Sequence, residues 1–188
     1  MKHISITSAL TVVLGVTVAS AAQANSGGTI HFTGSVNDQT CTIEGGAGTG
    51  GGQNDFTVAL DAVSANDLAA AGATTGKKIF SINVGKDGEA TCVDGKTNRL
   101  SFEVSSPRIN PTSGALTNEI AGGAGNTEVQ LLDDAGVAIN LADPANGVDF
   151  EIIGNKAQID LAAQYLAVGG GATPGAVRTN VLYRVTYN

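Results

Sequence analysis

Apolar and polar residues alternate along several short stretches of this chain, and each stretch is typical of a β-strand. Near the carboxyl end, residues 177–187 carry apolar side chains at most odd-numbered positions and polar side chains at most even-numbered ones. Near the amino end, residues 29–36 repeat the pattern, and Ile30, Phe32, Gly34 and Val36 share one face. A period of two predicts a strand with one buried and one solvated face. We therefore expect one such strand near each end.

Further strand patterns fill the middle of the chain, separated by glycine-rich runs that read as loops. Asp133–Gly136 is a hairpin turn signal. Ser64–Asp67 reads as a capping box that begins one short helix, over residues 68–71 and ending at Gly72. Nine or ten short strands and one small helix predict an antiparallel sandwich rather than an α/β fold. The middle strands are expected at residues 40–43, 55–60, 78–84, 99–105, 128–132, 137–141, 148–153 and 157–168.

The first 24 residues have the pattern of a secretory signal peptide. A short basic head precedes an apolar run over residues 4–19, and Ala22-Gln23-Ala24 is a small-x-small cleavage site. A membrane anchor is the alternative, but the apolar run is short for a span and no basic cluster follows it. The mature chain is then expected to begin at Asn25 and to form one domain.

Cys41 and Cys92 are the two cysteines of the chain. In a secreted protein an even pair predicts one disulfide, which here closes a loop of about 50 residues and contributes about 4 kcal/mol in the chain-entropy model. A pair of metal ligands is the alternative. Only His31 remains after signal cleavage and no C-x-x-C occurs, so this alternative is disfavoured.

Charge and motif content argue against nucleic-acid binding and against enzyme chemistry. The chain carries 10 basic and 17 acidic residues and has no basic patch, which disfavours nucleic acid and anionic membrane surfaces as partners. A G-x-G-x-x-G match at residues 46–51 is followed by a strand pattern, whereas a dinucleotide site needs a helix there. His31 is expected to face solvent, and no nucleophile lies beside it. We expect no catalytic residue, no cofactor and no metal.

Three tyrosines offer a second candidate binding chemistry, because aromatic rings stack on carbohydrates. Tyr165, Tyr183 and Tyr187 all lie on the apolar parity of their strands. Packing residues with a hydroxyl at the rim of the core are therefore favoured over a sugar-stacking set.

Several segments, taken in order, resemble the major structural subunits of chaperone–usher fimbriae, the type 1 pilin group. Residues 27–34 look like an amino-terminal donor-strand extension, with Cys41 following, and residues 129–136 look like the mid-chain hairpin of that family. Near the end, Gly175 stands fourteenth from the carboxyl end and Tyr187 is penultimate. The likeness spans nearly the whole mature chain.

The resemblance implies an all-β, incomplete immunoglobulin-like sandwich that lacks its last strand. A hydrophobic groove then lies beside the carboxy-terminal strand. In this family a periplasmic chaperone fills the groove first, and the extension of the next subunit replaces it by donor-strand exchange. Residues 25–37 would form that extension and residues 38–188 the pilin domain.

The donor strand is expected to insert Ile30, Phe32, Gly34 and Val36 into the groove. Burying the three large side chains is worth about 1.5–3 kcal/mol each, or roughly 5–9 kcal/mol before ordering costs. Gly34 marks either a strand bend or a pocket too shallow for a side chain, and we favour the pocket.

The receiving edge, which the chaperone would contact first, is expected at the carboxyl end. The expected partners are other copies of the chain, a periplasmic chaperone and an outer-membrane usher. The expected location is a cell-surface fimbria reached through the periplasm. A minor adaptor or tip subunit of the same kind of fimbria is the main alternative, and a free secreted enzyme is the third.

The residues assigned to the receiving edge at the carboxyl end are Gly175, Val181, Tyr183, Val185 and Tyr187.

Overall fold

The computed structural model describes residues 40–188, which belong to one compact unit of the chain. The predicted signal peptide and donor strand lie outside the described residues. Within them, eight strands and one short 3-10 helix are formed, and no helix is long and apolar enough to cross a membrane. The strands are β1 (Ile43–Gly45), β2 (Thr74–Gly85), β3 (Thr97–Phe102), β4 (Leu116–Thr117), β5 (Thr127–Leu132), β6 (Val148–Glu151), β7 (Lys156–Ala167) and β8 (Tyr183–Thr186), and the 3-10 helix η1 spans Ala65–Leu68.

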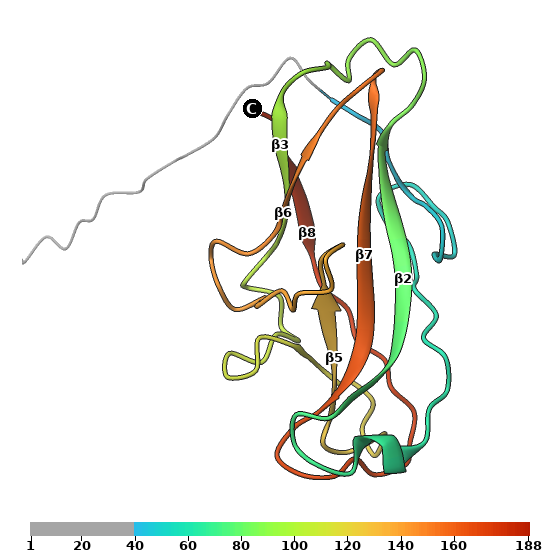
Figure 1. The fold of residues 1–188 in the computed structure, drawn as a ribbon, viewed down its shortest axis with the longest axis vertical. Coiled ribbons are helices and arrows are strands. Elements are labelled where there is room, and N and C mark those ends of the chain that lie inside the picture. Colours follow the sequence, from blue (N-terminus) through green and yellow to red (C-terminus); the bar gives the residue numbers. More distant parts are fainter. Residues whose placement is uncertain (1–39) are drawn as a thin grey trace, which may run out of the picture. The chain divides into compact units, whose positions relative to one another are not determined.

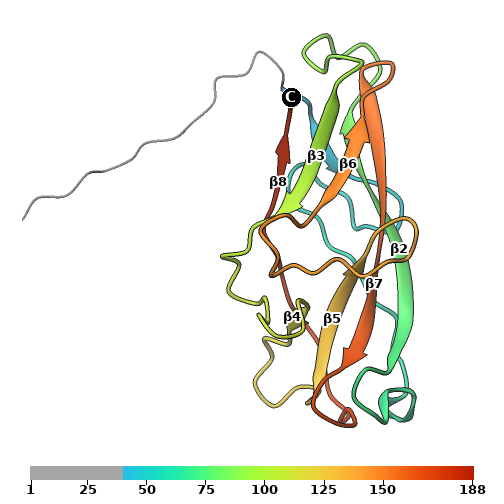
Figure 2. The ribbon, with the colours of Figure 1, turned by 60° about the vertical axis from the view of Figure 1, so that its left-hand side comes forward.

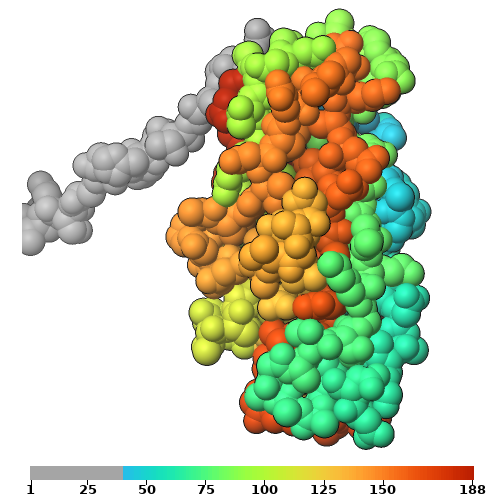
Figure 3. Space-filling model, in the orientation of Figure 1, coloured from blue at the N-terminus to red at the C-terminus, as the bar shows by residue number. Residues whose placement is uncertain are grey.

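The strands form two antiparallel sheets, which confirms the expected all-β sandwich. The larger sheet has the order β1-β2-β7-β5-β4, and the smaller one has the order β6-β3-β8. Figure 1 shows β2 and β7 running side by side, with β3, β6 and β8 in the second layer. The loop between β5 and β6 forms part of the face seen in Figure 3. Because β8 pairs with β3 alone, it is an edge strand of the smaller sheet (Figure 2).

The core lies between the sheets and is built from the alternating residues that the pattern predicts. In the β2–β7 ladder, Phe80 faces Leu161 and Ile82 faces Ile159. Leu100 from the smaller sheet is fully buried and belongs to the same cluster. One parity of each strand thus fills the space between the layers, as a sandwich requires.

The strand expected over residues 99–105 ends earlier, at Phe102, and Val104, which lies on the apolar parity of that stretch, is exposed. The side chain of Asn146 occupies the place of a neighbouring strand. Its Oδ1 accepts from the Phe102 amide at 2.7 Å, and its Nδ2 donates to the Phe102 carbonyl at 3.0 Å. A turn then begins, in which the Ser106 amide donates to the carbonyl of Glu103. A side-chain amide 44 residues away therefore ends the strand, which local alternation cannot reveal.

Five other local expectations also differ from the structure. The strand expected at the carboxyl end, over residues 177–187, is formed only at Tyr183–Thr186. The hairpin turn at Asp133–Gly136 is present, but its second arm keeps only an isolated bridge at Ala138. Ser64 caps a helix as expected, yet that helix is one 3-10 turn over residues 65–68. The strand expected over residues 40–43 forms at 43–45 instead, and β4 was not predicted. Residues 55–60 are extended with the expected alternation of burial, but they join neither sheet.

The glycine-rich run over residues 45–52 lies against β2, which explains its composition. The Gly46 amide donates to the Ser81 carbonyl at 2.8 Å, and the Ser81 amide donates to the Ala47 carbonyl at 2.9 Å. A Cβ at Gly48 would stand 2.3 Å from the main-chain oxygen of Ile79, and its φ is +76°. The run is therefore a closely packed loop, as predicted, and not a phosphate-binding turn.

Candidate functional site

The carboxy-terminal segment, residues 176–188, presents a continuous row of half-buried side chains. Odd-numbered residues from 177 to 187 are half-buried, and even-numbered residues are exposed. The apolar members of the row pack against the core cluster. A row that packs on the core and still keeps part of its surface exposed forms the floor of an open groove. Its apolar members are Val177, Val181, Tyr183, Val185 and Tyr187.

A second half-buried row faces the first from residues 54–63. Phe56, Val58 and Leu60 pack against the same core cluster, and the residues between them are exposed. The rings of Phe56 and Tyr183 lie 5.8 Å apart, and the Tyr183 hydroxyl donates to the Asn54 carbonyl at 2.6 Å. The two rows therefore meet at one end of the groove.

At the other end the rows enclose a cavity of about 350 Å³. Leu60 and Val63 line it from one row, and Gly175 and Val177 line it from the other. A Cβ at Gly175 would stand 2.3 Å from the main-chain nitrogen of Ala124, so only glycine fits this close approach. The cavity has the size and apolar character to take one large aliphatic side chain.

The main chain along the floor of the groove is unpaired on its open side. Even-numbered residues bond to the rest of the domain: the Glu119 amide donates to the Arg178 carbonyl at 2.8 Å, and the Glu103 amide donates to the Leu182 carbonyl at 2.8 Å. Within residues 40–188, the main-chain groups of Val177, Thr179 and Val181 have no hydrogen-bond partner. Main-chain groups of alternate residues point to opposite sides of a strand, so these three face the groove. Such an edge is a template for one more strand.

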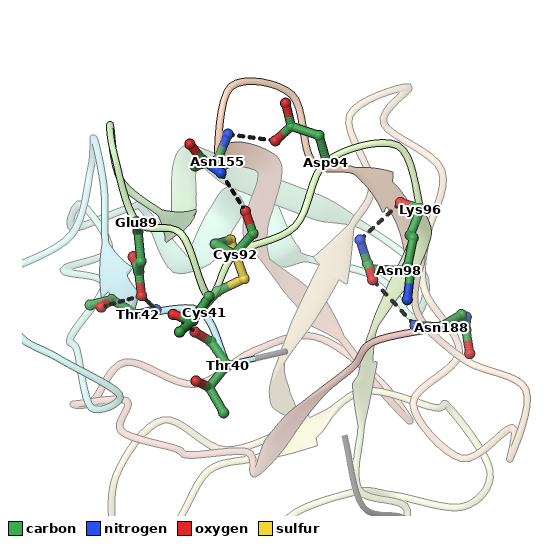
Figure 4. Close-up of a disulfide and its surroundings, with 11 residues drawn as sticks. Thr40, Cys41, Thr42, Glu89, Cys92, Asp94, Lys96, Asn98, Asn155 and Asn188 are labelled. Atoms are coloured by element: carbon green, nitrogen blue, oxygen red, sulfur yellow. Dashed lines mark hydrogen bonds between the residues drawn. A yellow bond between two sulfur atoms is a disulfide. The ribbon is translucent and has the colours of Figure 1, made fainter. Parts of the chain in front are cut away.

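The disulfide predicted from the sequence lies beside the end of this segment (Figure 4). Cys41 and Cys92 are bonded, with their Cα atoms 4.7 Å apart. The main chain of Cys41 lies beside the Tyr187 hydroxyl and lowers its pKa. Asn155 Nδ2 donates to the Cys92 carbonyl at 2.8 Å. The bridge therefore fixes the place where the last inward tyrosine is held.

The groove tyrosines stay protonated at neutral pH and act as packing groups with a hydrogen-bonding tip. Burial raises the pKa of Tyr183, and the Asp55 carboxylate and Tyr187 raise it further. Burial also raises the pKa of Tyr187; the Cys41 main chain beside it opposes this, and the Glu89 carboxylate adds to it. No group of three or more metal-ligating side chains is assembled within residues 40–188.

The raised tyrosine pKa values predict that the folded domain loses stability in alkali. A group whose pKa is higher in the folded state contributes stability that is present below its unfolded pKa, near 10.0 here, and is lost as pH rises through its folded pKa. We expect the urea midpoint to fall between pH 9 and pH 11.5, and to fall less in Tyr187→Phe. A midpoint that stays level over this range, or an equal fall in the variant, would contradict the assignment.

The residues predicted for the receiving edge lie together in the structure, and their role stays a prediction. Val181, Tyr183, Val185 and Tyr187 share the floor of the groove, and Gly175 lines its cavity. Ile30, Phe32, Gly34 and Val36 lie outside the described residues. Sequence reasoning did not assign Phe56, Val58 and Leu60 to the site, although they share one face of the strand expected at residues 55–60. Their alternation next to a glycine-rich loop was the available signal.

Comparisons with known proteins agree on one family. Residues 30–188 match the family described as "Fimbrial protein". The major fimbrial subunit SMF-1 of Stenotrophomonas maltophilia is 36% identical over 169 residues, covering 86% of this chain and 92% of that protein. The F17 fimbrial protein of Escherichia coli is 36% identical over 182 residues, covering 93% and 96%. The alignments cover nearly the whole length of both relatives.

Solved structures show the same fold. A chain from the structure of a chaperone–usher pilus superimposes with a TM-score of 0.57 at 20% identity, covering 87% of this chain and 96% of that chain. The P pilus rod subunit PapA superimposes with a TM-score of 0.54 at 20% identity, covering 72% and 94%. The two-sheet arrangement is thus the immunoglobulin-like sandwich found in pilus subunits.

Proposed function

The chain belongs to the fimbrial protein family and is a structural subunit of a cell-surface fimbria rather than an enzyme, and on that premise we propose that it polymerises by donor-strand complementation. In this proposal the amino-terminal extension, residues 25–37, of one copy fills the groove of the next copy. The observation that carries the proposal is the edge at Val177, Thr179 and Val181, where an apolar half-buried row coincides with unpaired main-chain groups.

An added strand matches both features of this edge. Main-chain hydrogen bonds supply affinity that does not depend on sequence, and alternate side chains seated in the groove set the register. Ile30, Phe32 and Val36 supply apolar side chains at the required spacing of two. A small-molecule ligand would use the apolar row but would leave the main-chain groups unpaired.

The proposal extends to the partners that act before assembly. An exposed edge strand with an apolar face promotes aggregation. We propose that a periplasmic chaperone covers the groove after signal cleavage near Ala24, and that an outer-membrane usher delivers the subunit to the growing fibre. Tyr187, held at the disulfide, marks the end of the edge that the chaperone contacts.

The chain is proposed to be the repeating subunit of the fibre, which supports adhesion of the cell. Its similarity to SMF-1, itself named a major fimbrial subunit, supports this role. A minor adaptor or tip subunit is the second candidate, since it carries the same groove and extension. Immunogold labelling separates them: a repeating subunit is labelled along the fibre, and a tip subunit only at its end.

Gel mobility tests the polymerisation itself. Fibres sheared from cells should run as a ladder in SDS without boiling, because a fully inserted strand dissociates slowly. Boiling should collapse the ladder to one band of the mature chain. A single band in unboiled samples, from cells that secrete the protein, would contradict the proposal.

A further inference from the structure

Residues 176–182 form half of the floor of the groove, yet they belong to no strand. The strand β8 pairs with β3 only over residues 183–186, and β3 itself ends at Phe102, opposite Tyr183. Residues 176–182 nevertheless keep the alternation of burial that marks an extended chain. Fixing the backbone of each residue costs conformational entropy, so contacts other than a neighbouring strand must hold this half of the floor.

Two side chains hold this segment in the place of a neighbouring strand. Asn118 Nδ2 donates to the Ala176 carbonyl at 2.9 Å, and Asn118 Oδ1 accepts from the Arg178 amide at 3.1 Å. Ser106 Oγ accepts from the Leu182 amide at 3.0 Å. These two anchors therefore bond to main-chain groups at both ends of the segment.

Both anchors are themselves held by the domain. Asn118 Oδ1 also accepts from the Ile120 amide at 3.1 Å, and its Nδ2 also donates to the Ala124 carbonyl at 3.2 Å. A side-chain amide has two N–H donors and a carbonyl with two lone pairs, so Asn118 uses its full bonding capacity. Ser106 is 4% exposed, and its amide donates to the Glu103 carbonyl at 2.9 Å. The positions of both anchoring groups are thus set by the rest of the domain.

A third side-chain contact, on the outer side of the segment, contributes less. Arg178 Nε pairs with the carboxylate of Glu119, but the Arg178 side chain is 73% exposed. Exposed ion pairs contribute little, because water and salt screen them and long side chains lose freedom when they are held. Asn118 and Ser106 are therefore the main side-chain contacts that order this part of the floor.

Each bond from the two anchors to the segment reaches an even-numbered residue. Main-chain groups of alternate residues point to opposite sides of a strand, so bonding the even-numbered residues turns those of Val177, Thr179 and Val181 toward the groove. We propose that Asn118 and Ser106 are positioning residues, which order the receiving edge before a strand is added. An edge that is ordered in advance loses less entropy on binding. The inference rests on the proposed function and adds two residues that act through the floor of the groove.

Two matched pairs of full-length variants test this role. Asn118→Ala and Ser106→Ala each remove one anchor. Asn110→Ala and Ser113→Ala are their controls, because both of these side chains bond to the carboxylate of Glu128 and to a nearby main-chain amide. Within residues 40–188, neither control side chain bonds to the segment 176–182. Each pair therefore removes similar bonds from the floor and from another part of the domain.

The rate of assembly is compared with the stability of the subunit in all four variants. Pulse-labelled, exported Asn118→Ala should enter the SDS-resistant ladder about tenfold more slowly than Asn110→Ala, because it loses two bonds to the floor. Ser106→Ala loses one such bond and should enter about threefold more slowly than Ser113→Ala. The urea midpoint of the folded subunit should fall to a similar extent within each pair. A merely structural role slows assembly only as far as the midpoint falls, so a rate that follows the midpoint across all four variants overturns the proposal.

The Ser106→Ala and Ser113→Ala pair decides the question if Asn118→Ala yields no folded chain. Wild-type chains that form no SDS-resistant ladder refute donor-strand polymerisation itself. Wild-type ladders, together with equal rates of entry within each pair, refute only the positioning role of Asn118 and Ser106.

Discussion

Fibre growth is expected to stop when Phe32 is replaced by Asp, while the chain is still exported and folded. Phe32 is proposed to be the largest side chain that the donor strand buries, worth about 1.5–3 kcal/mol. The carboxylate that replaces it would enter an apolar groove without a counter-ion, which costs more than the lost burial. Electron microscopy of cells and unboiled gels of periplasmic extracts measure the outcome. Gly34→Leu should act in the same direction, by excluding the strand from its shallow pocket.

The matched control carries the same charge on the opposite face of the donor strand. Thr33 lies on the outward parity of residues 29–36, so Thr33→Asp should leave fibres of normal length. Long fibres from Phe32→Asp would refute the donor-strand assignment. Short fibres from both variants would show that charge anywhere in the segment is harmful, and would equally remove the support for an inward face at Phe32.

A matched pair of variants tests the receiving groove in the same way as Phe32→Asp and Thr33→Asp test the donor strand. Val181→Asp places a charge on the floor of the groove, whereas Leu182→Asp changes a neighbour that is 58% exposed. Only Val181→Asp should block assembly. Phe32→Asp retains a receiving groove, and Val181→Asp retains a donor strand, so the two together should form heterodimers that grow no further. Fibres in the mixed sample would contradict the division into one donor and one receiver.

Loss of the disulfide is expected to have the largest effect on the stability of the single subunit. The bridge links residues 51 apart, and closing a loop of that length stabilises by about 4 kcal/mol in the chain-entropy model. The urea midpoint of Cys41→Ser/Cys92→Ser should therefore fall by about 2 M at a typical slope for a small domain. Without the bridge, hydrogen bonds still hold Thr42: its amide and its hydroxyl donate to Glu89 Oε1 at 2.8 and 3.0 Å, and the Gly85 amide donates to its carbonyl at 2.7 Å.

Reduced wild-type protein is the control for this prediction. Cys92 is fully buried, so serine there adds the cost of burying a hydroxyl. Reduction with the cysteines retained isolates the contribution of the bridge. We expect reduced wild type to lose most of what the double variant loses. A reduced chain with the midpoint of the oxidised chain would refute the predicted contribution.

Sequence patterns gave the faces of the strands correctly wherever one face packs on the core. Phe80, Ile82 and Leu100 lie on the apolar parity of the strands expected at residues 78–84 and 99–105, and all three are buried. The pattern was wrong where a distant group intervenes. Asn146 ends β3 before Val104, and no local feature of residues 99–105 carries that information. The short helix was overestimated: the cap at Ser64 is followed by a single 3-10 turn, of which only Leu68 is buried.

The candidate site also has one part that the sequence predicts and another part that only the fold assembles. The parity of Val181, Tyr183, Val185 and Tyr187 follows from alternation, which depends only on the geometry of an extended chain. The opposite wall, formed by Phe56, Val58 and Leu60, does not follow from alternation, because a groove needs two segments that are distant in sequence. The bond from Tyr183 to Asn54 joins residues 129 apart, and only the tertiary fold brings them together.

The sequence by itself determined which side of each strand faces inward, that two cysteines pair, and that the termini carry matching strand patterns. The tertiary structure decided that the carboxy-terminal row lies half-exposed, opposite Phe56, Val58 and Leu60. The physical reason is that side-chain direction is a local property of the backbone. Whether an edge is paired, covered or open depends on contacts across the whole domain.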